Sequence, residues 1–455
     1  MPVSSRVSTD DESRARARTD RAVLIASAVG AAMVTVGACA ASQGTLEPAA
    51  ATAGAPMSQG ARLACETSPE GITLPQGFCA ITVAESLGRA RHIAVAPNGD
   101  LFVAMNNARG ARGGVVALRD TDRDGRADLT ERFGINGGTG ILLHGTWLYF
   151  ATNDAVLRYP MRPGSLTPSG EPDTVVMGLP SDRGHPAKSI AIGRDGALHV
   201  NIGSPSNMCS VREQPQPDPC PELENRAGIW RFDANRLRQT QADGRRFAAG
   251  IRNAVGVTIN PATGTLFAVQ HGRDNLHQFF PQLYSEQESA ESPSEELQAV
   301  QEGDDFGWPY CYHENAQGKK LLTPEYGGDK HSEGRCAQVE EPVAYFPGHW
   351  APNSVVFYNA TQFPARYRGG AFIAFHGSWN RAPRPQAGYN VVFVPMRGDS
   401  ATGPFEVFAD GFAGENVSPN GARYRPTGVG IATDGGLYIV DGQKGRIWKV
   451  MYVGR

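Results

Sequence analysis

Apolar and polar residues alternate along most of this chain, and one alternating phrase recurs six times. Each copy is a glycine-containing turn that leads into an apolar run, and the copies are residues 98–103, 144–149, 195–200, 263–268, 368–373 and 434–439. A further apolar run precedes four of the copies, at residues 92–96, 189–192, 255–259 and 429–432. Glycine turns between apolar runs are typical of β-hairpins, so the pattern predicts six hairpins.

Six hairpins at spacings of tens of residues are typical of a repeated β-architecture. We therefore expect an all-β fold, a six-bladed β-propeller over residues 61–455, with long loops on the face that binds ligands. A tandem of β-sandwiches is the alternative. Alternating βαβ units do not fit, because the pattern lacks long amphipathic helices.

One helix is predicted in the longest stretch between two hairpins. Ser292 offers an N-cap, Pro293 suits the first helical position, and Glu295 stands where a capping box has its acid. The helix is expected to continue over residues 296–302 and to end at Gly303.

The first part of the chain has the pattern of an export signal. Basic residues within 14–21 precede an apolar run over 22–36, and small residues lead directly to Cys39. This run is shorter than the roughly 20 residues that a membrane span needs. We predict a signal peptide over residues 1–38 and a flexible, lipid-anchored tether over 39–60. A short anchor helix that stays in the mature chain is the alternative.

Cysteine usage agrees with export. Apart from Cys39, six cysteines form three pairs of near neighbours: Cys65 and Cys79, Cys209 and Cys220, Cys311 and Cys336. Closure of short loops favours these local disulfides, which form in an oxidising compartment. We therefore expect an exported, membrane-anchored lipoprotein, in the periplasm or the outer membrane if the host is Gram-negative. Ala40 after the cysteine favours the outer membrane.

Residues 120–131 match the twelve-residue calcium loop of EF-hands. The predicted metal ligands, at loop positions 1, 3, 5, 7, 9 and 12, are Asp120, Asp122, Asp124, Arg126 through its carbonyl, Asp128 and Glu131. Gly125 stands at position 6, where the loop turns sharply. Flanking helices are not evident, so the loop is expected on a connection between strands, with a structural role. A solvated acidic turn is the alternative.

Composition narrows the possible partners. The chain has 43 Lys and Arg against 46 Asp and Glu, a net charge of −3. A nucleic-acid-binding protein would show a strong basic excess, so no nucleic-acid partner is expected. The 54 glycines and 32 prolines suit a turn-rich fold.

An ordered series of short motifs resembles the quinoprotein sugar dehydrogenases. The motifs are residues 178–181, 184–186, 192–196, 201–204, 250–253, 270–273, 305–309 and 376–381. The resemblance runs from about residue 75 to 452 and is closest to the sorbosone dehydrogenase-like branch, with soluble glucose dehydrogenases more distant. It implies a six-bladed propeller that binds pyrroloquinoline quinone and Ca²⁺.

The resemblance also implies an activity. A sugar, or a related aldehyde or alcohol, would be oxidised by hydride transfer to the calcium-bound quinone. His185 would be the base that takes the hydroxyl proton, and Arg252 would polarise the reacting quinone carbonyl. The other implied contacts are Asn253, Arg91, Arg381 and Arg425 to the anionic cofactor, and the carbonyls of Gly272 and Arg273 to a catalytic calcium. Electrons would leave to a separate acceptor, because the chain has no haem-attachment CxxCH motif.

The chain departs from the family pattern at four positions. Ser204 stands where the glucose branch has an acid that orients the base, and Lys188 stands where many relatives have Arg. Arg273 replaces a proline of the metal-binding motif, and Asn359 is nearest to the cofactor lysine of the glucose branch.

Two other functions remain open for a propeller of this kind. A calcium-dependent lactonase needs carboxylates and an Asn around a central metal, whereas the acids here gather in residues 120–131. A non-catalytic surface propeller that binds glycan or protein would keep the fold without the chemistry. Uptake of the quinone separates the dehydrogenase from both.

Overall fold

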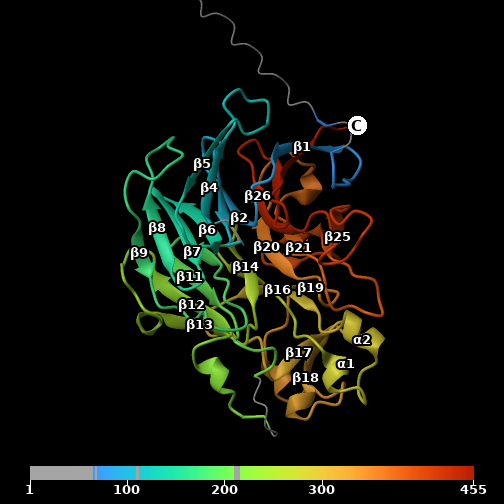
Figure 1. Ribbon diagram of the computed structural model, residues 1–455. Helices are drawn as coiled ribbons and strands as arrows, with labels where there is room; N and C mark the ends of the chain where they lie inside the picture. The colour runs from blue at the N-terminus through green and yellow to red at the C-terminus, as the bar shows by residue number, and fades with distance from the viewer. Residues whose placement is uncertain (1–64, 67–68, 109–111, 210–215, 455) are drawn as a thin grey trace, which may run out of the picture. The chain divides into compact units, whose positions relative to one another are not determined.

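The computed structural model describes residues 65–66, 69–108, 112–209 and 216–454. Within these residues, six antiparallel sheets of four strands each form the blades of a propeller (Figure 1). The inner strands contact one another in the order β2, β6, β10, β14, β20 and β26, and β26 returns to β2. All six inner strands line a central cavity of about 390 Å³. The predicted six-bladed, all-β fold is confirmed.

The first three blades follow one another along the chain, each from its inner to its outer strand. Blade 1 consists of β2 (Ala90–Val95), β3 (Leu101–Met105), β4 (Gly114–Arg119) and β5 (Leu129–Phe133). Blade 2 consists of β6 (Gly138–His144), β7 (Trp147–Thr152), β8 (Val156–Pro160) and β9 (Asp173–Val176). Blade 3 consists of β10 (Ile190–Ile192), β11 (Ala197–Ile202), β12 (Gly228–Asp233) and β13 (Arg245–Ala249).

The last three blades keep the same order but contain insertions. Blade 4 consists of β14 (Ala254–Ile259), β15 (Leu266–Gln270), β16 (Glu295–Val300) and β19 (Ala344–Phe346). Blade 5 consists of β20 (Pro352–Phe357), β21 (Ala371–His376), β22 (Tyr389–Val394) and β25 (Glu406–Ala409). Blade 6 consists of β26 (Pro426–Ile431), β27 (Leu437–Asp441), β28 (Ile447–Tyr452) and β1 (Phe78–Ala84).

Each predicted hairpin joins the first and second strands of one blade. Its glycine has a positive φ, between 59° and 94°, at Gly99, Gly145, Gly196, Gly264, Gly369 and Gly435. Glycine adopts this left-handed conformation without the steric cost of a Cβ. This requirement explains why the sequence pattern marks all six blades.

The ring is closed by β1, which comes first in the chain but forms the outer strand of the last blade. It pairs antiparallel with β28, from Phe78 opposite Tyr452 to Ala84 opposite Ile447. The ring of Phe78 packs edge-on against Phe363 and Phe408, with centroids 4.8 and 5.0 Å away. The closure is therefore held by apolar packing as well as by the strand ladder.

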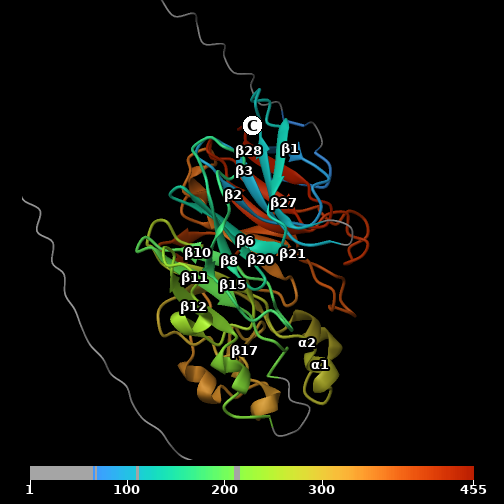
Figure 2. The same ribbon diagram turned by 60° about the vertical axis from the view of Figure 1, so that its left-hand side comes forward.

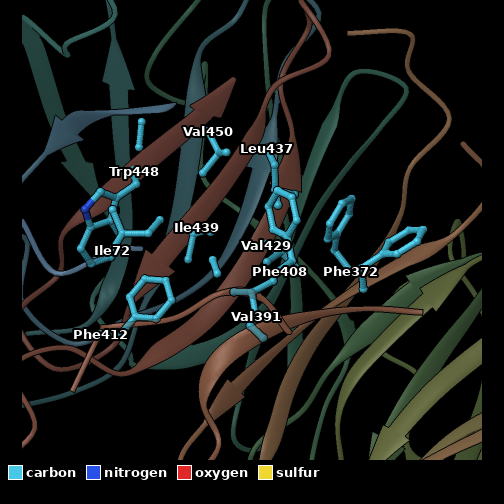
Figure 3. Close-up of a cluster of buried hydrophobic side chains, with 14 of the residues drawn as sticks. Ile72, Phe372, Val391, Phe408, Phe412, Val429, Leu437, Ile439, Trp448 and Val450 are labelled. Carbon is cyan, nitrogen blue, oxygen red and sulfur yellow. The ribbon is translucent and has the colours of Figure 1, made fainter. Parts of the chain in front are cut away.

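The core lies between neighbouring sheets. Figure 3 shows the cluster between blades 5 and 6, where Leu437 and Ile439 of β27 lie close to Val391 and Phe372 of blade 5. Trp448 of β28 is fully buried in the same cluster. Alternating positions along each strand supply such contacts, as expected for packed sheets.

The predicted helix over residues 296–302 is wrong. Most of these residues belong to β16, which ends at Val300 and pairs with β15 on one side and β19 on the other, and Leu297 of this strand is buried in the core. The helix in this stretch is α2 (Glu286–Glu291), which is capped by Ser285 and ends before Ser292. Pairing along both edges of the strand outweighs the local capping signals.

Short helices and two small hairpins make up the insertions. The α-helices are α1 (Leu276–Phe279) and α2, and the 3₁₀ turns are Pro221–Glu224, Gln241–Asp243, Pro324–Tyr326, Gly334–Gln338 and Ala365–Tyr367. The hairpins are β17 (Cys311–Glu314) with β18 (Lys319–Leu322), and β23 (Met396–Arg397) with β24 (Ser400–Ala401). Both views place α1, α2 and β17 beside each other, next to blade 4 (Figures 1 and 2).

All three predicted disulfides are confirmed: Cys65 with Cys79, Cys209 with Cys220, and Cys311 with Cys336. The predicted signal peptide and tether lie outside the described residues. In the part of the chain that the structure describes, no helix is long and apolar enough to cross a membrane.

Candidate active site

The residues that the resemblance assigns to the base, the cofactor and the catalytic calcium lie at one face of the propeller, on loops or, for Arg91, at the start of β2. Each loop either enters the inner strand of a blade or joins its second and third strands. These two positions meet at the same end of a blade, because adjacent strands are antiparallel. The loops before β10 and β14 carry His185 and Arg252, and the loop after β15 carries Gly272 and Arg273.

The imidazole of His185 is oriented by the loop after β11. Its Nδ1 lies 2.8 Å from the carbonyl oxygen of Ser204 and 3.2 Å from Ser204 Oγ. A carbonyl oxygen only accepts hydrogen bonds, so Nδ1 carries a proton and Nε2 does not. Burial, and after it the charge of Arg252, lowers the pKa of His185 to about 3. The ring is thus neutral, with an unprotonated Nε2, as a general base requires.

Gly203 allows the base to approach this loop closely. A Cβ at Gly203 would lie 2.6 Å from His185 Cβ, closer than two carbon atoms can approach. The next residue is Ser204, where the glucose branch has an acid. Here the Ser204 carbonyl takes over the orienting contact.

Arg252 is buried and anchored by three neighbours. Its Nη1 donates to the Gly272 carbonyl at 2.8 Å, and its Nε donates to the Asn207 carbonyl at 3.1 Å. Its Nη2 donates to Asn207 Oδ1 and to Asp274 Oδ2, both at 3.0 Å. Four of the five guanidinium N–H groups are therefore committed to the protein, and one N–H on Nη1 remains.

Asp274 is a site residue that the sequence motifs did not single out. Besides Arg252, its carboxylate accepts from Asn380 Nδ2 at 2.8 Å and faces His349 Nδ1 at 3.4 Å. Burial opposes its ionisation, but the contacts with His349, Arg252 and Asn380 outweigh burial and hold the pKa of Asp274 well below its usual range. In the sequence, the one indication that Asp274 belongs to the site is its position directly after the 270–273 motif.

Glu295 is a second carboxylate that was missed, because its segment was predicted to be a helix. It lies beneath the Gly272 turn, where its Oε2 accepts from the Gly272 N–H at 3.0 Å and its Oε1 from the Ala351 N–H at 3.2 Å. Burial raises the pKa of Glu295 to about 7. It fixes the main chain of the turn that carries Gly272 and Arg273.

Two cations face the site without a carboxylate partner among the described residues. Arg91 forms no ion pair, and its buried Nε has no hydrogen-bond partner there. Burial, and after it the charge of Arg425, lowers the pKa of Arg91 to about 10. The side chain of Arg425 donates only to the carbonyls of His376 and Gly377, at 2.8 and 2.9 Å, whereas its main-chain N–H donates to Asp441 Oδ1 at 2.6 Å. No ion pair among the described residues therefore neutralises these two side chains.

The histidines around these arginines add no charge. Burial, and after it the charge of Arg91, lowers the pKa of His92 to about 4. Burial, and after it the charge of Arg252, lowers the pKa of His271 to about 4 as well. Burial and Arg425 also hold the pKa of His376 well below its usual range. Two of them bind the main chain, since His92 Nε2 lies 2.7 Å from the Asn353 carbonyl and His271 Nε2 lies 2.9 Å from the Pro352 carbonyl.

Asn253 leaves a buried acceptor free at the same place. Its side chain is 5% exposed, and its Oδ1 has no hydrogen-bond partner among the described residues. Buried polar atoms are almost always paired. The free acceptor of Asn253 fits a ligand with an N–H or O–H donor, whereas the arginines without ion pairs fit an anionic group.

Gly272 and Arg273 differ in what they offer to a metal. The Gly272 carbonyl accepts from Arg252 and keeps a second lone pair. The side chain of Arg273 is turned away, and its Nη1 donates to both carboxylate oxygens of Glu325 at 2.6 Å. Only the main chain of Arg273 is therefore suited to bind a cation.

Arg381 is the predicted site residue that the structure does not bring into the cluster. Its Nη1 donates to the carbonyls of Ala290 and Gly348, both at 2.8 Å, and its Nη2 pairs with Glu291 at 2.7 Å. The side chain is buried in these contacts. It anchors the loop rather than facing the other arginines.

The predicted calcium loop connects β4 and β5, as expected for a loop on a connection between strands. The carboxylates of Asp120, Asp122 and Asp124 gather so that one oxygen of each lies within 4.8 Å of the others. Asp128 instead accepts from the N–H and Oγ1 of Thr121, both at 2.7 Å. Glu131 lies in β5 outside the acidic group.

Arg126, at loop position 7, is exposed, and its Nη2 donates to Glu66 at 2.8 Å. The guanidinium of Arg126 is itself a cation, so only the main-chain carbonyl of this residue is suited to bind a metal ion. Metal binding by the loop stays a prediction.

Comparisons with known proteins agree with this geometry. A family model described as TrAA12-like matches residues 72–453. A pyrroloquinoline quinone-dependent pyranose dehydrogenase of Coprinopsis cinerea is 24% identical over 417 residues, which cover 83% of this chain and 54% of that protein. The chain spans about half the length of the curated relatives it matches.

Solved structures share the fold. A Trichoderma reesei enzyme of carbohydrate-active family AA12 superposes with a TM-score of 0.69 at 20% identity, covering 84% of this chain and 98% of that one. The holo quinone domain of the Coprinopsis cinerea pyranose dehydrogenase superposes with a TM-score of 0.67 at 21% identity, covering 84% and 97%.

Proposed function

The chain belongs to the TrAA12-like family, and we propose on that premise that it oxidises a sugar, or a related aldehyde or alcohol, with bound pyrroloquinoline quinone and Ca²⁺. Relatives of the chain are quinone-dependent sugar dehydrogenases. The sorbosone dehydrogenase-like branch stays a prediction, and so does a separate electron acceptor.

The observation that carries the proposal concerns two arginine side chains at the loop face. The side chains of Arg91 and Arg425 form no ion pair among the described residues, and Asn253 Oδ1 is buried there without a partner. Buried charges and polar atoms are costly unless they are paired. An anionic quinone would supply the negative charge that the two arginines lack, and an N–H or O–H group of the ligand could donate to Asn253 Oδ1.

The chain's own groups provide the proton chemistry. When bound, the quinone supplies the acceptor for the hydride equivalent, and a calcium at the carbonyls of Gly272 and Arg273 supplies positive charge. His185 Nε2 takes the hydroxyl proton of the substrate, while Nδ1 stays bonded to Ser204. Arg252 keeps one N–H free for an oxygen at the reacting end of the site.

Cofactor uptake tests the proposal. The cofactor-free protein is titrated with the quinone, with and without Ca²⁺, by calorimetry and absorbance, and is then offered aldoses and aldehydes with an artificial acceptor. We expect saturable, calcium-dependent uptake and reduction of the acceptor. Arg425→Gln should weaken uptake, whereas Arg162→Gln, in an exposed loop at the opposite face, should not. Absence of uptake by the wild-type protein would overturn the proposal in favour of a non-catalytic propeller.

We also propose that the protein is exported and held to a membrane through Cys39. Three disulfides support an oxidising compartment. Cys39→Ala should release the protein from the membrane fraction. A variant that still fractionates with membranes would contradict the lipid anchor.

A further inference from the structure

Lys188 is a fully buried lysine at the start of blade 3. Its side chain is 0% exposed, and it forms no ion pair with a carboxylate of the described residues. Its Nζ donates to the carbonyl oxygens of Pro180 at 2.9 Å and Pro186 at 2.6 Å. Burying an ammonium group without a counter-ion is costly, and an apolar side chain of similar length would avoid the cost. The contacts of Lys188 therefore need an explanation beyond packing.

The two carbonyls bracket the segment that carries the base. Pro180 stands at the beginning of residues 180–186 and Pro186 at the end, one residue after His185. The tip of this segment, residues 181–184, is exposed. One ammonium group therefore ties together the two ends of an exposed loop.

His185 is also held from the opposite side. Its main-chain N–H donates to the Ser204 carbonyl at 3.2 Å, and its ring donates to the same oxygen. The loop tip is tied down separately, because Asp182 pairs with the buried Arg226. Of these anchors, the Lys188 ammonium is the one that links the residues on both sides of the base.

We propose that Lys188 is a positioning residue for the base: its ammonium closes the 180–186 segment and so fixes the imidazole of His185. This inference rests on the proposed function, in which His185 takes the substrate proton. Lys188 acts through His185 and not on the cofactor, so its loss should lower kcat and leave quinone affinity unchanged. Arginine at this position could also donate to two carbonyls.

The test compares variants of the quinone-loaded, full-length protein. Lys188→Met should lower kcat about 10- to 100-fold, the loss typical of a displaced reacting group, with the quinone Kd unchanged. Lys188→Arg should recover most of the turnover. The matched control is Lys449→Met, which removes another buried lysine, in blade 6, where Nζ donates to Asp434 at 2.6 Å. It should keep kcat.

A double-mutant cycle separates positioning from general stabilisation. If Lys188 acts through the base, Lys188→Met should cost nothing further in a His185→Ala background. Additive losses, an unchanged kcat in Lys188→Met, or a parallel loss of quinone affinity would each overturn the inference. If Lys188→Met does not fold, Lys188→Gln, which keeps a neutral NH₂ group on a shorter side chain, carries the same comparison. Full activity of His185→Ala alone would instead contradict the proposed base.

Discussion

At the scale of single residues, the site depends on where a few hydrogen bonds go. The Ser204 carbonyl decides which nitrogen of His185 carries the proton, and no carboxylate is needed for that. Arg252 and Asp274 hold each other at 3.0 Å, so the charge of this arginine is fixed in place before any ligand arrives. Arg91, in contrast, has no such partner among the described residues.

Replacing His185 with Ala should lower turnover by about 10²–10⁴-fold, the loss typical of a missing general base. Quinone affinity should remain, because the arginines and Asn253 are untouched. Steady-state kinetics together with a binding titration measure both quantities. Ser204→Ala is the control: it removes only the hydroxyl at 3.2 Å and keeps the carbonyl at 2.8 Å, so turnover should stay near wild type. Full activity of His185→Ala would contradict the assignment.

Arg91 and Arg381 should respond oppositely to the same substitution. Arg91→Gln removes a buried cation that Arg425 repels, so the melting temperature of the cofactor-free protein should not fall. Quinone binding should weaken by about 2–5 kcal/mol, as for the loss of one partner of a buried charge pair. Arg381→Gln should destabilise the protein by about 1–3 kcal/mol, because the Ala290 and Gly348 carbonyls lose their donor. Thermal melts and calorimetry compare the two, and a reversed order would contradict these roles.

At the scale of elements, the loops do different work from the strands that carry them. The strands bury apolar side chains between blades, whereas the loops at one face present charge and backbone carbonyls. The loop between β4 and β5 is a separate unit, in which Asp120 accepts the N–H groups of Arg123 and Gly125 at 2.7 and 2.8 Å. These bonds hold a shape that brings three carboxylates together.

Removing the acids of this loop should remove one bound calcium. The pair Asp120→Asn and Asp124→Asn should lower the calcium stoichiometry by one and leave any metal at the quinone site. At a calcium concentration about 100 times Kd, a bound ion stabilises by about 2.7 kcal/mol, so a chelator should lower the melting temperature of the wild type more than that of the variant. The matched control is Asp329→Asn, whose carboxylate also accepts from its own loop, at the N–H groups of His331 and Ser332. Unchanged stoichiometry in the double variant would count against the loop.

At the scale of the whole molecule, burial keeps several histidines neutral. Burial is the main cause that lowers the pKa of six histidines. The pKa falls to about 3 at His185, to about 4 at His92, His199, His271 and His313, and well below the usual range at His376. In the unfolded chain these groups take up protons near pH 6.5. Between pH 6.5 and about 4 the unfolded state therefore binds more protons than the folded state.

The free energy of unfolding should accordingly fall as the pH drops from 6.5 towards 4. Each such histidine contributes up to about 1.4 kcal/mol per pH unit. Denaturant titrations of the cofactor-free protein at several pH values measure the slope. His199→Gln, which lies in β11 away from the base, should reduce the slope. A slope near zero over this range would contradict the prediction.

The sequence alone determined the features that depend on local chemistry. Gly145 and its five counterparts mark the hairpins because a positive φ is a property of the turn itself. The three disulfides follow from short separations along the chain, 14, 11 and 25 residues. The motif resemblance pointed to His185 and Arg252, which the structure places on loops that enter β10 and β14. Their roles stay predictions.

Only the tertiary structure decided what depends on pairing between distant segments. Residues 295–300 carry helix-start signals but form β16, because β15 and β19 satisfy both of its edges. Asp274 joins the site because the fold brings it to Arg252, Asn380 and His349, which lie on three other loops. Arg381 was predicted among the cofactor contacts, but its guanidinium is hydrogen-bonded to Glu291 and to the carbonyls of Ala290 and Gly348. A side chain's local sequence sets what it can donate or accept, whereas the packing of the blades sets which partner it meets.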